Sequence, residues 1–449
     1  MKIKKIGEVL FIIFLLFLMY MVLNFYNVNN FNDFDLSKSD LKISKFSRDK
    51  EVKYSQKPSY KISSEDYNDA MFSETIKVKK DTSYKVTCMV KTKDVVSENN
   101  LTGSGAQISI EESTEKSQSI AGTNDWQKLE MIFNSRGREE INIGFRLGGY
   151  VDKCKGEAWF SDFKMEEGEK EKNADWKFAC FIFDTVNATV NGENINYTLS
   201  QNDISDIKNT IRRFESSVKE ISNGLMTSAQ CDTYQISTPI TELTYDETYK
   251  YYVDSSSVEP QIKEYMNGNN YDYVFIIFKL DDKQVKDWVG LGAMEYYGLG
   301  YSNIRLLNKE NNYLYRYNAR INRFPEEVFI HEFLHTYEKT LQEYGYKVPN
   351  LHDHLKYGYT NQGTEGLKQW YADYMTCNIK TEDENIGLDP IVYTIKPTKQ
   401  SDFENSIEIE NAFHEPQNLF EEIIQIFTKA GTNLADIFKE EEEGNNNGR

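Results

Sequence analysis

The stretch Phe329-Ile330-His331-Glu332-Phe333-Leu334-His335-Thr336 decides the fold of the C-terminal part of this 449-residue chain. In an α-helix, side chains at positions i and i+4 lie on the same face, one turn apart. The imidazoles of His331 and His335 can therefore reach one metal ion. Glu332 stands beside the first histidine and can contact a water on that ion without being a ligand. The spacing predicts a helical metal site.

The residues around this stretch favour a helix that begins near Pro325 and runs to Tyr344. Proline suits the first turn of a helix, and the acidic residues Glu326 and Glu327 interact favourably with the helix N-terminus. Gly345 is a typical residue to end a helix. Apolar side chains occupy the opposite face and are expected to pack on a core: Ile330, Phe333, Leu334, Tyr337 and Leu341.

Residues 329–336 resemble the active helix of the zincin metallopeptidases, which carry an H-E-x-x-H motif. The resemblance implies a zinc ion with His331 and His335 as ligands. It also implies that Glu332 acts as general base, taking a proton from the metal-bound water and passing it to the leaving amine of a peptide bond. A zincin-like α/β (α+β) metallopeptidase domain is accordingly expected over residues 175–438.

The third metal ligand must come from outside this stretch. Glu338 stands where the metzincin pattern requires glycine, and a gluzincin-like glutamate would be Glu365. The geometry of the chain favours another segment. From His335 to Tyr344 a helix rises about 14 Å at about 1.5 Å per residue. An extended chain covers that distance in about 4–5 residues, so it comes back level with the metal near residue 350.

The segment at that level is Leu351-His352-Asp353-His354. We predict His352 as the third zinc ligand, with Asp353 as its hydrogen-bond partner or as a substitute ligand. His354 and Glu365 remain alternatives.

Three further predictions concern the surroundings of the metal. Tyr357 is a candidate catalytic residue, because several zincins place a tyrosine near the zinc to donate a hydrogen bond to the tetrahedral intermediate. Asp373 could brace a ligand histidine. Residues 301–306 read as a strand that could form the sheet edge pairing with an extended substrate. The glycine-rich residues 289–293 before it read as a loop.

The N-terminal half has a different pattern, in which apolar and polar residues alternate at period two. Turn residues separate these short segments, which is typical of an all-β jelly roll or β-sandwich; we place this module at residues 51–168. The clearest segments are 84–90, 107–110, 141–147 and 156–163. Residues 124–129 and 156–163 resemble the closing strands of jelly-roll carbohydrate-binding modules, which implies a possible glycan ligand.

The N-terminal segment indicates where in the cell the protein is expected to lie. Residues 1–27 combine lysines with an apolar run long enough to cross a bilayer, and we predict a signal anchor with the bulk of the chain extracellular, or secretion if this segment is cleaved.

Residues 28–50 read as a linker and 439–449 as a disordered acidic tail. The charged run 166–172 reads as a hinge. Strands at 178–183 and 271–280 and an amphipathic helix over 204–221 indicate an α/β sheet covered by helices.

Charge and cysteine content narrow the functional classes. With 52 basic and 71 acidic residues the net charge is −19, which disfavours nucleic-acid binding. Five scattered cysteines indicate neither a disulfide scaffold nor a cysteine zinc site. The sequence therefore predicts a membrane-anchored zinc endopeptidase acting on proteins or glycoproteins. The alternative is a surface glycan-binding or adhesion protein with an inactive metal domain.

Overall fold

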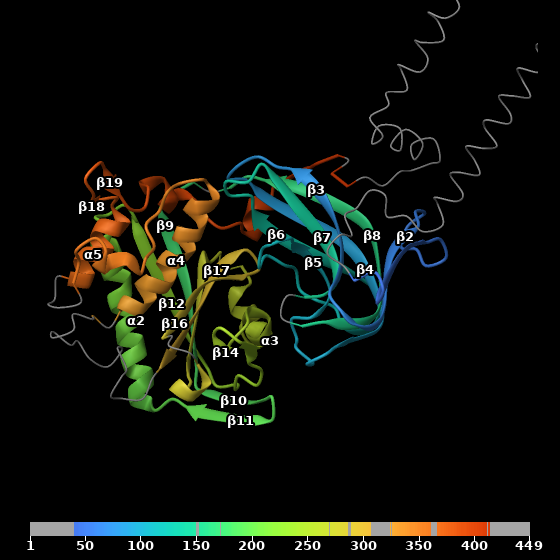
Figure 1. Ribbon diagram of the computed structural model, residues 1–449, viewed down its shortest axis with the longest axis horizontal. Coiled ribbons are helices and arrows are strands. Elements are labelled where there is room, and N and C mark those ends of the chain that lie inside the picture. Colours follow the sequence, from blue (N-terminus) through green and yellow to red (C-terminus); the bar gives the residue numbers. More distant parts are fainter. Residues whose placement is uncertain are drawn as a thin grey trace, which may run out of the picture.

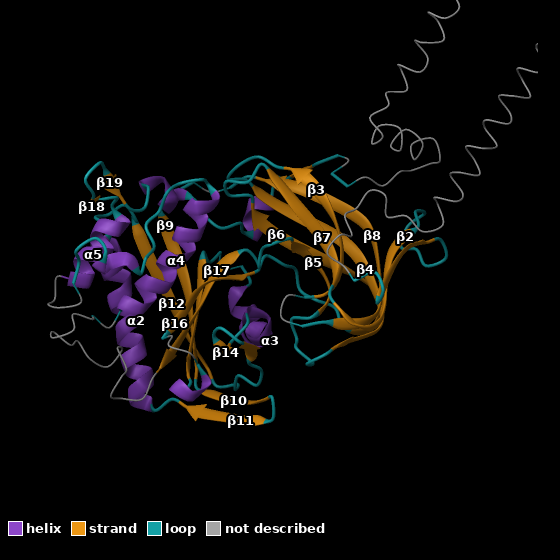
Figure 2. Cartoon of the chain, in the orientation of Figure 1, coloured by secondary structure: helices purple, strands orange, loops and turns teal. Residues whose placement is uncertain are grey.

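The computed structural model describes residues 40–149, 152–170, 172–268, 270–285, 289–306, 324, 326–360, 366–410 and 412–413 (Figure 1). These residues form a β-sandwich and an α/β domain that lie side by side (Figure 2). The predicted anchor at residues 1–27 and the predicted tail at 439–449 lie outside the described residues. Within the described ranges, no helix is both long and apolar enough to span a membrane.

Two antiparallel sheets build the β-sandwich. The larger sheet has the order β1-β2-β8-β4-β6 and the smaller one β3-β7-β5. Phenylalanines from both sheets fill the space between them, as in the stacked pair Phe72 and Phe145 and the edge-to-face pair Phe72 and Phe160. This confirms the predicted β-sandwich. The strands are β1 (Ser44–Asp49), β2 (Ser59–Asn68), β3 (Ala70–Lys77), β4 (Ser83–Ser97), β5 (Gly105–Ile110), β6 (Gly122–Asn134), β7 (Glu140–Gly148) and β8 (Cys154–Gly168).

The sandwich extends beyond its predicted limits at both ends. Strand β1 lies in the predicted linker, where it pairs with β2. A short strand, β20 (Ile407–Glu408), returns from the C-terminal part of the chain and pairs with β8. Beyond β20, the ring of Phe413 packs on Phe145 and Phe163 in the sandwich core. The chain therefore returns from the α/β domain to the sandwich, which sequence periodicity does not reveal.

The predicted hinge at 166–172 lies between the two domains as expected, but its first residues belong to strand β8 and several of its charges are paired within the fold. Glu166 belongs to β8 and forms a 2.8 Å salt bridge with Lys85. Lys170 is almost fully buried and pairs with Asp81. A run of charges of alternating sign can thus be the end of a strand whose charges form salt bridges within the fold, as well as a solvated linker.

A five-stranded sheet with the order β12-β9-β15-β17-β16 forms the centre of the α/β domain. The first four strands are parallel, and β16 runs antiparallel at the edge. The strands are β9 (Asp175–Phe183), β12 (Ser228–Ile236), β15 (Tyr273–Lys279), β16 (Gly290–Tyr296) and β17 (Leu299–Leu306). The helices are α2 (Gln201–Ile221), α3 (Ser255–Met266), α4 (Glu327–Glu343) and α5 (Gly366–Met375).

Both faces of this sheet are covered. Phe178, Cys180 and Ile182 of β9 face a core that includes α2, α4 and α5. The alternate residues of β9 face a second core that includes α3. This accounts for the nearly continuous apolar strands of the sequence. Small elements complete the domain: β10 (Thr185–Val190), β11 (Glu193–Thr198), β13 (Thr244–Asp246), β14 (Lys250–Tyr252), β18 (Ile379–Lys380), β19 (Asn385–Ile386), and 3-10 turns at Asp282–Gln284, Asp353–Leu355, Pro390–Thr394 and Gln400–Phe403.

The edge of the sheet differs from the prediction. Residues 301–306 belong to β17, which lies between β15 and β16 and is not an edge. The edge strand is β16, which includes most of the predicted glycine-rich loop. Gly290 and Gly292 have no side chains on the face of β16 that lies against helix α4, so the strand can approach the helix closely. A Cβ atom at Gly290 would stand 2.3 Å from Cγ of Glu332.

Candidate metal centre

Helix α4 carries the first two candidate ligands. It spans Glu327–Glu343, and Gly345 follows it with φ of +83°, which confirms the predicted helix end; Pro325 lies outside the described residues. The ring of Phe333 fixes the opposite face of the helix on the sheet, 5.1 Å from Phe178 and 5.2 Å from Tyr273 between centroids. Packing on this face turns the two histidines away from the core.

The imidazoles of His331 and His335 meet through their Nε2 atoms, which are 3.1 Å apart. On its far side, Nδ1 of His335 donates to Oε2 of Glu338 at 2.9 Å, because a carboxylate can only accept. Nδ1 of His331 lies 3.0 Å from the hydroxyl of Tyr371. That hydroxyl donates its proton to Glu327 at 2.5 Å, so it accepts from His331. Both rings therefore present an Nε2 lone pair to the same point.

His352 completes the cluster, as the sequence predicts. Its ring centroid is 4.8 Å from that of His331 and 5.0 Å from that of His335. One potential ligand atom from each of the three histidines lies within 4.8 Å of the others. Desolvation lowers the pKa of His352, and neighbouring His335 lowers it further. A neutral imidazole is the form that binds a metal ion.

These residues fit a zinc ion. Two nitrogen ligands at about 2.1 Å from a tetrahedral ion are about 3.4 Å apart, close to the observed separation of the Nε2 atoms. Two lone pairs at that distance repel each other unless a cation or a proton lies between them. Three histidines, of which His331 and His335 have hydrogen-bonded Nδ1 atoms, are also a typical zinc donor set. Residues His331, His335 and His352 would hold the ion.

Glu332 lies next to this cluster beneath the edge strand. Its side chain is buried, and the backbone N–H of Gly292 donates to its carboxylate. Burial, together with the nearby Glu327, raises the pKa of Glu332 to about 8 against the opposing effects of His335 and the Gly292 N–H. A carboxyl group with a pKa near neutrality suits proton transfer in both directions.

Glu338 has a role that the sequence analysis missed. Its Oε2 accepts from His335, and its Oε1 accepts from the backbone N–H of Leu351 at 3.2 Å. One carboxylate thus orients a ligand of helix α4 and holds the loop that carries His352. The available signal was the spacing of His335 and Glu338, because residues at i and i+3 are neighbours on a helix.

Three predicted neighbours take other positions. The ring of Tyr357 stacks on Trp370 with centroids 6.0 Å apart, and no contact among the described residues joins it to the three histidines. Asp373 accepts from the hydroxyl of Tyr359 at 2.7 Å and braces no ligand histidine. Asp353 pairs with Lys356 at 3.3 Å.

The alternative ligands are not part of the cluster either. His354 lies against Trp370, at 6.3 Å between ring centroids, and is not among the clustered histidines. Glu365 lies outside the described residues. Of the candidates beyond helix α4, the structure therefore brings only His352, among the described ones, to the metal position.

Comparisons with known proteins give structural neighbours only. No protein-family model and no curated protein matches the chain. Among solved structures, TmCBM61 in complex with β-1,4-galactotriose is 13% identical, with a TM-score of 0.23, over 30% of this chain and 90% of that one. The CBM22-1 xylan-binding domain of Paenibacillus barcinonensis Xyn10C is 14% identical, with a TM-score of 0.21, over 31% and 88%. A carbohydrate-binding module of Cellvibrio mixtus lichenase 5A with cellotriose is 9% identical, with a TM-score of 0.19, over 28% and 92%.

Proposed function

We propose that this chain is a zinc-dependent endopeptidase. The observation that carries the proposal is the convergence of three imidazoles beside one buried glutamate, under the edge strand of a sheet. Three neutral nitrogen ligands leave a fourth position for water or substrate, which is typical of catalytic zinc sites. When bound, zinc would acidify that water and polarise a carbonyl oxygen.

The side chains of the protein would supply the other parts of the reaction. Glu332 is placed to take a proton and to return it to the leaving amine. Among the described residues β16 has a strand partner on one side only, so an extended peptide would add to the sheet there as a further strand. Glu338 and Tyr371 would keep the ligand rings oriented. Substrates would be proteins or glycoproteins, and the predicted anchor would place the site outside the cell.

Metal removal tests this proposal directly. We expect the purified full chain, incubated with a denatured protein mixture, to produce new N-termini detected by mass spectrometry. A chelator should abolish these products because three histidines without a metal ion have no means of activating water. Adding one equivalent of zinc should restore them. Cleavage that persists in the metal-free chain would contradict the proposal.

A second role, glycan binding by the β-sandwich, is supported by a surface aromatic pair of which Tyr54 is exposed and Trp126 half-buried. Tyr54 is 47% exposed, and its ring lies 5.6 Å from that of Trp126 on β6. Lys91 and Asp125 form a 2.7 Å salt bridge beside them. Aromatic rings flanked by polar groups suit the mixed apolar and polar surface of a sugar.

The chain offers a matched control for this second role. Tyr245 of the α/β domain is 48% exposed, and its ring lies 5.3 Å from Tyr251 at the same 60° tilt. We expect Tyr54→Ala to weaken binding on a glycan array about tenfold or more, since stacked aromatic anchors dominate such contacts. Tyr245→Ala should leave binding unchanged. Equal effects of the two substitutions would remove the aromatic pair as the binding site.

A further inference from the structure

We propose that Arg136 of the β-sandwich is a positioning residue: it holds edge strand β16 in place against helix α4. It thereby sets where an extended substrate would lie relative to Glu332. The inference rests on the proposed peptidase function, because it concerns the position of a peptide substrate. Its structural part, the fixation of β16 by the other domain, can be tested independently.

One guanidinium group joins the strand to the helix. Arg136 lies in the turn between β6 and β7, and its Nη2 donates to Oε1 of Glu295 on β16 at 2.9 Å. Its Nη1 donates to both carboxylate oxygens of Glu343, the last residue of α4, at 3.1 and 3.3 Å. The side chains of Arg136 and Glu295 are 10% and 4% exposed. Charge-assisted bonds shielded in this way are strong and geometrically specific.

The strand needs such an attachment because its pairing within the sheet is irregular. The register between β16 and β17 shifts between Leu291 and Met294, and Ala293 has φ of +58°. On the helix side, the N–H of Gly292 meets the carboxylate of Glu332. Strand β16 is thus held by Glu332 near its start and, through Glu295 near its end, by Arg136 and by Lys339 of α4, whose Nζ lies 3.7 Å from Oε1 of Glu295.

The two domains are in close backbone contact around this attachment. A Cβ atom at Gly137 would lie 2.3 Å from the carbonyl oxygen of Glu343, so the turn rests directly on the end of α4. At the tip of the β16–β17 hairpin, a Cβ at Gly298 would lie 2.8 Å from the carbonyl oxygen of Ile132. These glycines allow the sandwich to approach both elements that form the candidate site.

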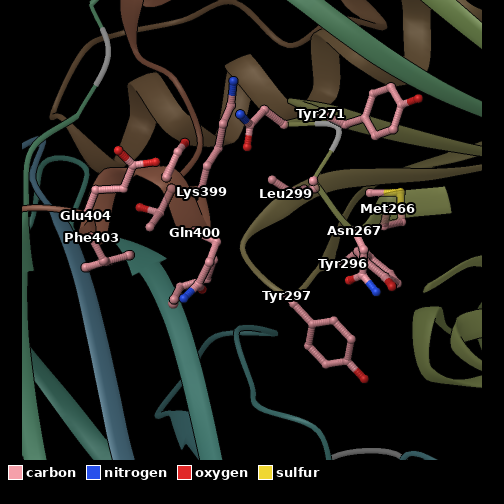
Figure 3. A pocket seen from close by; sticks show the side chains of 15 residues that line it. Met266, Asn267, Tyr271, Tyr296, Tyr297, Leu299, Lys399, Gln400, Phe403 and Glu404 are labelled. Atoms are coloured by element: carbon pink, nitrogen blue, oxygen red, sulfur yellow. The ribbon is translucent and has the colours of Figure 1, made fainter. Parts of the chain in front are cut away.

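One part of the surroundings of the β16–β17 hairpin is open. Beside it lies an open pocket of about 660 Å³, lined by Tyr296, Tyr297 and Leu299 on one side and by Gln400 and Phe403 on the other (Figure 3). Tyr296, Leu299 and Tyr301 of the hairpin also belong to the second core, and specific contacts add to this packing. Among these, the bonds of Arg136 reach both the strand and the helix.

The test uses the full chain with the double substitution Arg136→Met and Glu295→Gln. Replacing both partners avoids leaving the buried Glu295 carboxylate with only Lys339, at 3.7 Å, as a positive neighbour, which would destabilise the fold by itself. We expect faster hydrogen exchange over residues 290–296 with unchanged zinc content. For a fluorogenic peptide chosen from the cleavage products, KM should rise about tenfold with kcat nearly unchanged. Arg136→Lys should show a smaller rise.

The double substitution Arg138→Met and Glu115→Gln is the matched control, because it also replaces both members of a buried pair. Arg138 belongs to the same turn and forms a bidentate pair with Glu115 inside the sandwich, but its bonds reach neither β16 nor α4. It should lower stability without changing KM. Unchanged exchange over 290–296 in the Arg136→Met and Glu295→Gln variant would overturn the proposal, as would a fall in kcat at constant KM, which indicates only a smaller active fraction. If the native chain cleaves nothing, the proposed function fails, while the exchange measurement still decides the role of Arg136.

Discussion

Glu332→Gln is expected to lower kcat/KM for peptide cleavage by about one hundred- to ten-thousand-fold, the usual contribution of a general acid–base group. The amide has nearly the same shape as the carboxyl group and can still accept from Gly292, so the edge strand should stay in place. What it loses is the ability to take up a proton from water and return it to the amine. The three histidines keep their positions, and zinc content should stay at one per chain.

The measurement combines kinetics with metal analysis on the same preparation. Glu220→Gln is a suitable control because Glu220 lies on α2, is 68% exposed, and pairs with Lys368 away from the metal centre. This control should retain full activity. Native rates in Glu332→Gln would show that another group transfers the proton. Loss of zinc together with activity would show that Glu332 acts on the metal site itself.

The local parts of this site could be predicted because helix geometry translates directly into sequence spacing. His331 and His335 had to share a face, and Gly345 had to end the helix. Even His352 followed from the rise of a helix and the reach of an extended chain. Each of these inferences depends on fixed backbone dimensions, not on tertiary packing.

The features that the sequence did not predict depend on contacts between distant segments. Tyr371 reaches His331 only because α5 packs beside α4. Gly290 and Gly292 read as loop residues, although alternate glycines also describe a strand with one bare face. The return of β20 to the sandwich and the pairing of Arg136 with Glu343 join residues more than 200 positions apart. The local periodicity of apolar residues in the sequence does not predict such pairings.

His352→Ala is expected to weaken zinc binding by more than about 100-fold, a larger loss than the about 10–100-fold typical of hydrogen-bond partners of metal ligands. Removing one of three nitrogen ligands leaves the ion on the helix pair alone. The side chain of His352 is exposed, so its truncation should cost little folding stability. Zinc affinity is measured by competition with a chromophoric chelator.

Two companion variants turn this measurement into a graded test of the site. Glu338→Gln keeps only one of the two acceptor oxygens that serve His335 and Leu351, so it should fall within the about 10–100-fold range. His354→Ala changes the neighbouring histidine, which lies on Trp370, and should leave the affinity unchanged. The predicted order of loss is therefore His352, then Glu338, then His354. A larger loss at His354 than at His352 would mean that the loop binds the metal through the other histidine, and the site would have to be rebuilt around it.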